Sequence, residues 1–141
     1  MAIDTHGFHV ARKEMRVHAG ALRDLAEHLP DLTETERRAG LARVVELLRS
    51  RVEPHTKLDE WLLFPAVADR LGDPLIAASM NYDHLAIRDW ISKIDKTDPK
   101  DLARLQRLLY GLDALIRVHV WKEEELFLAA LESSSWPETG T

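Results

Sequence analysis

The chain of 141 residues has the length of one domain, and its 45% hydrophobic and 30% charged residues are typical of a soluble globular protein. A formal net charge of −5 without a basic stripe disfavours a nucleic-acid-binding surface, and the absence of cysteine excludes disulfides, thiolate metal sites and cysteine nucleophiles. No apolar run is long enough to cross a bilayer and no secretory signal is visible, so we expect a cytoplasmic protein without a membrane partner.

Hydrophobic residues recur with a helical period almost throughout, and there is no alternating, strand-like segment. We predict four helices, over residues 5–29, 34–71, 74–95 and 99–132. Each break between them carries helix-ending and helix-starting signals: Pro30 before a capping box of Thr33 and Glu36, then Gly72-Asp73-Pro74, then Asp98-Pro99.

The predicted loops are only a few residues long, which makes sequential helices antiparallel neighbours. The sequence therefore predicts an all-α fold, an up-down-up-down antiparallel four-helix bundle. Pro54 falls inside the second helix and predicts a kink there, because proline removes a backbone hydrogen bond. The alternative is a break and five helices. We expect residues 1–132 to form the domain and residues 133–141, which are small, polar and interrupted by Pro137, to form a flexible tail.

One histidine can be taken from each predicted helix: His18, His55, His84 and His119. Each lies among apolar residues at helical spacing, so we expect all four to face the bundle core. These inward stripes include Leu62 after His55 and Leu126 after His119.

Two of the histidines are followed four residues later by an acid, in the segments HTKLD and HVWKE. Residues at i and i+4 lie about 40° apart on the same helix face, so Asp59 should project beside His55 and Glu123 beside His119. Glu60, at i+5, should point elsewhere, toward solvent or the edge of a neighbouring helix.

Four imidazoles and two carboxylates that converge in a bundle core indicate a metal site, because buried carboxylates need charged partners or a metal. Imidazole with carboxylate suits iron, manganese or zinc, and six side chains are too many for one tetrahedral zinc. Two iron ions fit the set. If Asp59 and Glu123 bridge them, each metal has two histidines and two carboxylate oxygens, with an oxo or hydroxo bridge as a fifth ligand. About one position per metal then remains for O₂, peroxide or nitric oxide.

Four segments, RVHAGALRDL, PHTKLDEWLLFP, YDHLAIRDW and VHVWKEEELF, resemble in kind and order the haemerythrin-like, or HHE cation-binding, domain. The resemblance covers nearly the whole chain. It implies a four-helix bundle around a non-haem di-iron centre that binds O₂ reversibly, senses oxygen or iron, or handles peroxide and nitric oxide. Carried over by position, the ligands are His18, His55, Asp59, His84, His119 and Glu123.

The sequence departs from the family pattern at two positions. The second-helix acid is usually glutamate and here is Asp59, whose shorter arm bridges less easily, so Glu60 or a water is an alternative ligand. Oxygen carriers have a fifth histidine one turn before the third-helix ligand, and Met80 stands in that place. The second departure favours sensing or redox chemistry over oxygen carriage.

Two further charged residues lie near the predicted ligands. Glu14 and Arg88 lie one turn from His18 and His84, and either orients a histidine or forms an exposed ion pair. His6, His9 and His28 are interpreted as surface residues.

Two other functions stay open. One is a metal-binding structural or signalling module without turnover. The other is a ferritin-like ferroxidase, which is less favoured because that class uses Glu-x-x-His. If the protein is an enzyme, we expect peroxidase-like, catalase-like or nitric oxide-reactive chemistry. Other divalent metals are compatible with the sequence, as is a monomer or weak dimer.

Overall fold

The computed structural model describes residues 4–133, and every regular element in that range is helical. In chain order the elements are α1 (His6–His28), η1 (Leu29–Asp31), α2 (Glu34–Leu47), η2 (Leu48–Val52), α3 (Glu53–Leu58), η3 (Asp59–Leu63), α4 (Phe64–Leu71), α5 (Pro74–Lys96), α6 (Leu102–Lys122), η4 (Glu123–Leu128) and α7 (Ala129–Glu132).

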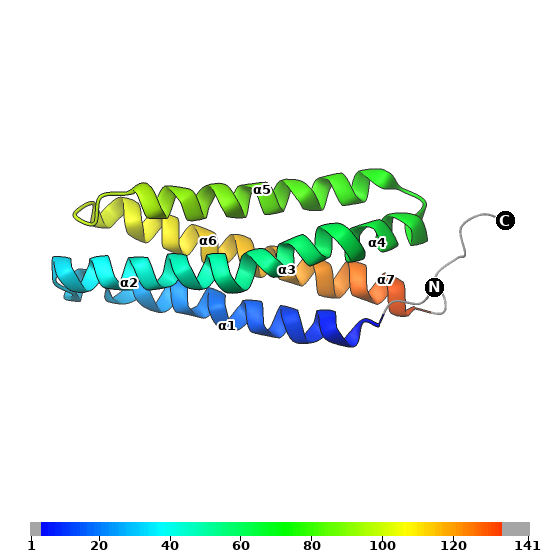
Figure 1. Ribbon diagram of the computed structural model, residues 1–141, viewed down its shortest axis with the longest axis horizontal. Helices are drawn as coiled ribbons and strands as arrows, with labels where there is room; N and C mark the ends of the chain where they lie inside the picture. Colours follow the sequence, from blue (N-terminus) through cyan, green and yellow to red (C-terminus); the bar gives the residue numbers. More distant parts are fainter. Residues whose placement is uncertain (1–3, 134–141) are drawn as a thin grey trace.

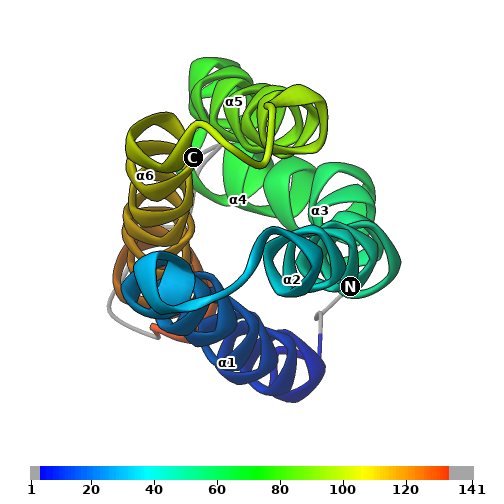
Figure 2. The same cartoon turned by 90° about the vertical axis from the view of Figure 1, so that its left-hand side faces the viewer.

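Several elements continue directly into one another, so the described chain runs as four helical rods: α1, α2 to α4, α5, and α6 to α7. The rods lie side by side in Figure 1, and Figure 2 shows them grouped around a common axis. The prediction of an all-α helical bundle is confirmed. Of the predicted tail, residues 133–141, all but Ser133 lie outside the described residues.

The rod ends follow the local sequence signals, with one correction. Thr33 and Glu36 form the predicted capping box, and Asp73 caps α5 after Gly72, which adopts a left-handed φ of 67°. The last long helix was predicted to begin at residue 99, but α6 begins at Leu102. The reason is that Asp101 accepts the capping hydrogen bond from the Arg104 N–H, whereas Asp98 accepts one from the Lys100 N–H and closes only a turn.

Three segments, η2, η3 and η4, are π-helical, so their hydrogen bonds span one residue more than those of an α-helix. Two of them begin at the acids of the predicted ligand set, Asp59 and Glu123. The third, η2, ends immediately before Glu53 and Pro54, where the proline ring would otherwise crowd the preceding turn. Such π segments are common at functional sites.

The buried apolar residues form two separate clusters. The larger includes Met15, Val52, Ile87, Ile116 and Val120, and the smaller includes Phe8, Leu63, Phe64, Met80 and Phe127. A layer of buried polar residues lies between the two clusters, and every rod contributes to it. This layer consists of Arg12, Asp59, His84, His119 and Glu123, each at most 1% exposed.

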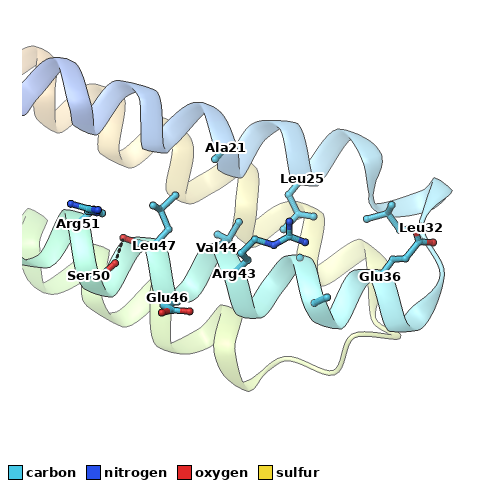
Figure 3. Close-up of a pocket in the computed structure, with 12 residues that line it drawn as sticks. Ala21, Leu25, Leu32, Glu36, Arg43, Val44, Glu46, Leu47, Ser50 and Arg51 are labelled. Atoms are coloured by element: carbon cyan, nitrogen blue, oxygen red, sulfur yellow. Dashed lines mark hydrogen bonds between the residues drawn. The ribbon is translucent and has the colours of Figure 1, made fainter.

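A groove of about 700 Å³ lies elsewhere, between α1 and α2, and Figure 3 shows its lining side chains. Leu25, Val44 and Leu47 contribute to its walls, together with Arg43 and Arg51. None of the predicted ligands lines it, so the groove and the polar layer are distinct features. No helix within residues 4–133 combines the length and hydropathy that a membrane crossing requires.

Candidate metal centre

Four of the six predicted ligands come together in the polar layer: Asp59, His84, His119 and Glu123. One potential ligand atom from each lies within 4.8 Å of the others, and all four residues are 0% exposed. They come from three rods, on η3, α5, and the junction of α6 with η4. The predicted i and i+4 pair on the last rod is in contact, because His119 Nε2 lies against Glu123 Oε1.

The two histidines face each other with their Nε2 atoms 2.8 Å apart. On the far side of each ring, Nδ1 contacts a carboxylate: His84 contacts Glu60 at 3.0 Å and His119 contacts Asp83 at 2.9 Å. A carboxylate accepts hydrogen bonds, so each Nδ1 carries the proton and each Nε2 of a neutral ring points its lone pair into the layer. Histidines that bind metals are oriented in this way.

The two orienting carboxylates are themselves held. Glu60 accepts a hydrogen bond of 2.8 Å from Arg88, which also donates to Thr56 Oγ1. Asp83 lies 2.5 Å from Lys122 Nζ. Glu60 thus faces the edge of α5, as the i+5 position predicted, and Arg88 supports it. Burial opposes ionisation, but the contacts with His119 and Lys122 hold the pKa of Asp83 down at about 2, so it stays charged.

Arg12 of α1 completes the layer, although sequence reasoning did not include it. Its Nε lies 2.6 Å from Glu123 Oε2, and its Nη2 donates to Asp59 Oδ1. The second oxygen of each carboxylate faces the histidine pair: Glu123 Oε1 contacts His119, and Asp59 Oδ2 lies 3.8 Å from His84 Nε2. Both carboxylates therefore connect the histidine pair on one side with the guanidinium on the other.

Burial and the neighbouring Glu123 carboxylate raise the pKa of Asp59 to about 8, although Arg12 acts in the opposite direction. The pKa of Glu123 is lowered, even though burial opposes this, because His119 and Arg12 stabilise its charged form. Of the two carboxyl groups, Asp59 is thus the one that holds a proton near neutral pH.

The two histidines also differ in protonation. Burial, followed by the positive charge at His119, lowers the pKa of His84 to about 4. Burial acts in the same direction on His119, but contacts with Asp83 and Glu123 outweigh it and raise the pKa of that ring. A cation that enters the layer therefore competes with protons on Asp59 and His119.

His18 and His55 are not part of this buried group. Both are only partly buried, whereas His84 and His119 are fully buried, so these two histidines face the core less completely. The physical reason is angular: Ala19 and Thr56, the next residues along each rod, take the fully buried positions. Glu14 contacts His55, with Glu14 Oε2 at 3.4 Å from His55 Nε2. Burial and then the charge of Arg12 lower the pKa of His55, which indicates that the guanidinium lies nearby.

Met80 is buried in the smaller apolar cluster. His9 and His28 are exposed, as predicted. The sequence analysis missed Arg12 and Asp83. A signal for Arg12 was present, because buried positions on α1 recur at steps of three and four residues and Arg12 falls on them. Asp83 gave no comparable signal, since its contact with His119 joins two rods.

The donor set fits a cation. Asp59 Oδ2 and Glu123 Oε1 are buried and accept no hydrogen bond of normal geometry within residues 4–133. Buried oxygens of this kind are costly unless something compensates them. The two facing Nε2 atoms lie close to these oxygens. Nitrogen and oxygen donors without sulfur suit iron, manganese or zinc. The four residues are therefore able to hold one cation.

Comparison with known proteins supports the same conclusion. The family described as the Hemerythrin HHE cation binding domain matches residues 7–131. No curated protein and no solved structure gives a significant match. Because the match covers most of the chain and the buried group is one that could hold a cation, the chain belongs to the hemerythrin HHE cation-binding family.

Proposed function

We propose that this chain is a non-haem iron protein that binds O₂ or a related small ligand, for oxygen or redox sensing or for the handling of peroxide or nitric oxide. One observation carries the proposal: the Nε2 atoms of His84 and His119 face each other at 2.8 Å, beside two buried carboxylate oxygens that accept no hydrogen bond of normal geometry within residues 4–133. These four donor atoms lie together in the buried layer, where a cation would meet two imidazole nitrogens and two carboxylate oxygens.

The proposed ligands are those predicted from the sequence, divided between two positions. Asp59, His84, His119 and Glu123 would hold the first iron. A second iron would use His18 and His55 with the other oxygens of the two carboxylates, which would then bridge the pair. The proposal takes the rods to run up-down-up-down, with the second rod kinked near Pro54. A cytoplasmic location, and a monomer or weak dimer, stay predictions from the sequence.

Bound iron would supply electrons to a small ligand, and the chain would supply the setting for that chemistry. Because the four gathered side chains are 0% exposed, a reactant must be small enough to enter the bundle, as O₂, peroxide and nitric oxide are. Asp83 and Glu60 would hold the protons on Nδ1 of the two histidines, so that both Nε2 atoms remain free to bind.

A metal-binding structural or signalling module without turnover is the second candidate. The burial of the layer favours this second candidate, because four ligands that are 0% exposed restrict the exchange of substrate and product. The two candidates differ in one measurement. Catalytic consumption of hydrogen peroxide or nitric oxide by the reduced, iron-loaded protein is expected only from a redox enzyme, and its loss in His119→Ala would place the activity at the centre.

The proposal is tested by metal content and an absorption spectrum. Protein loaded anaerobically with ferrous iron and then exposed to air should retain iron and gain a ligand-to-metal band in the near ultraviolet. The variant His28→Ala, which alters an exposed histidine, is the matched control and should behave as the wild type. Protein that keeps only trace iron and gains no band would overturn the proposal.

A further inference from the structure

The guanidinium of Arg12 is buried among the groups that a second cation would use. Arg12 is 1% exposed, and it contacts the outer oxygen of each carboxylate, Oδ1 of Asp59 and Oε2 of Glu123. The inner oxygens of the same carboxylates face the histidine pair. A bridging carboxylate offers one oxygen to each of two positive centres, so the geometry has one position open to a cation and the other filled by Arg12.

Other contacts fix this side chain. Its Nη1 lies 3.6 Å from Met15 Sδ, and its guanidinium carbon lies 6.0 Å from the centroid of the Phe8 ring. Met15 belongs to the larger apolar cluster and Phe8 to the smaller, so the guanidinium contacts both clusters. An arginine of this kind does not leave its position without breaking two charge-assisted hydrogen bonds.

We propose that Arg12 takes the place of the second cation, so that the centre binds one metal ion tightly and binds a second only by displacing the guanidinium. The inference rests on the proposed iron centre and concerns how many ions it holds. It makes Arg12 a positioning residue that sets the metal stoichiometry through its contacts with the two carboxylates.

Charge and geometry both disfavour a second ion while Arg12 is in place. The outer oxygens already accept N–H donors, and a cation entering beside them would meet the positive guanidinium in a buried, weakly screened setting. A single divalent ion with two carboxylates and one arginine leaves a net charge of about +1, whereas a second divalent ion raises it to about +3 unless an anion enters too.

The inference is tested by equilibrium dialysis of metal-free protein against ferrous iron under anaerobic conditions. We expect one tight step in the wild type and a second step weaker by roughly tenfold or more, because displacement breaks two charge-assisted hydrogen bonds. In Arg12→Gln the second step should tighten by roughly tenfold or more. The control is Arg16→Gln, which removes a half-exposed arginine that pairs with Glu124 and should leave both steps unchanged.

A spectroscopic readout separates one ion from two. After oxidation in air, wild type loaded with one equivalent should give the electron paramagnetic resonance signal of an isolated high-spin ferric ion. Arg12→Gln loaded with two equivalents should lose that signal, because two bridged ferric ions couple their spins. If Arg12→Gln fails to fold, the stepwise affinities of the wild type and of His55→Ala decide. His55→Ala should abolish the weak step and retain the tight one.

The outcomes distinguish failure of the inference about Arg12 from failure of the proposed iron centre. Two ferrous ions bound by the wild type with indistinguishable affinities would overturn the inference about Arg12 and leave the proposed iron centre standing. An Arg12→Gln protein that folds and still binds its second ion weakly would do the same. No ferrous iron bound by the wild type at all would overturn the proposed function.

Discussion

The two sides of the polar layer differ in how completely their ligand atoms are positioned to bind a cation. On the closed side, His84 and His119 are fully buried, and each is held by a carboxylate at Nδ1. On the open side, His18 and His55 are partly exposed, and Arg12 supplies the positive charge. The closed side has its ligand atoms in place before any metal arrives, which reduces the cost of ordering them on binding. The open side has to rearrange first.

Arg12→Ala should have the largest effect, on the stability of the metal-free protein. Removing it leaves two carboxylates buried together without their charged partner, and breaking a buried ion pair in this way costs about 3–5 kcal/mol. Urea denaturation of metal-free protein measures the loss. Arg16→Ala is the control, because its pair with Glu124 is partly exposed and should contribute about 0–1 kcal/mol. Equal losses for the two variants would show that Arg12 does not hold the layer together.

His119→Ala should have the next largest effect, on the affinity for the first cation. It removes a buried donor from the closed side and leaves Glu123 Oε1 without its neighbouring ring, so we expect a loss of more than about a hundredfold. Equilibrium dialysis against ferrous iron measures it. His9→Ala serves as the control because His9 is exposed and pairs with the exposed Glu132. Tight binding retained by His119→Ala would mean that the closed side is not where the first cation binds.

Asp83→Asn tests whether orientation of His119 matters by itself. An amide can offer its NH₂ group to Nδ1 and so favour the wrong tautomer, with the proton on Nε2. Loss of an orienting partner typically lowers metal affinity by about 10–100-fold. Asp89→Asn, on the exposed face of the same helix, is the matched control. If the two variants bind ferrous iron equally well, the contact between Asp83 and His119 has no part in binding.

Much of the fold could be predicted from the sequence, because helix periodicity and end signals are local. The centre was predicted less completely, and α1 shows why. Buried residues on that helix include Phe8, Arg12, Met15, Ala19 and Leu22, at alternating steps of four and three. His18 falls one position away from this stripe and Arg12 falls on it. The spacing of this stripe predicts a buried Arg12 and a less buried His18.

The π segments were not predicted, and they explain two further errors. Leu62 and Leu126 were expected to face the core, but both are exposed. Their neighbours Leu63 and Phe127 are buried instead. One extra residue in a helical turn moves the inward face along by one position, and η3 and η4 each begin just before these residues. Sequence periodicity assumes an unbroken α-helix, so it fails where the backbone widens.

The smallest effect we predict is on the pH dependence of cation binding, and it separates the two sides by their protons. In the metal-free protein the pKa of Asp59 is raised to about 8 and that of His119 is raised as well, so a cation at pH 7 has to displace protons from the closed side. His84, with its pKa lowered to about 4, is already neutral there. We expect about one to two protons to be released per cation at pH 7, with affinity rising about tenfold per pH unit for each proton released.

Calorimetric titration in buffers of different ionisation enthalpy counts these protons. The count should fall as pH rises past 8, where Asp59 is already ionised in the metal-free protein. The sign for stability is the reverse: a carboxyl group with a raised pKa stabilises the folded state fully below its ordinary value, and this contribution is lost as pH rises toward 8. Chelated protein should therefore lose the Asp59 contribution to stability as pH rises from about 4 to about 8, with little further loss above pH 8. The affinity for the cation should rise with pH as Asp59 loses its proton. A cation that binds at pH 7 without releasing any proton would mean that both carboxylates are already ionised and His119 is already neutral in the metal-free protein.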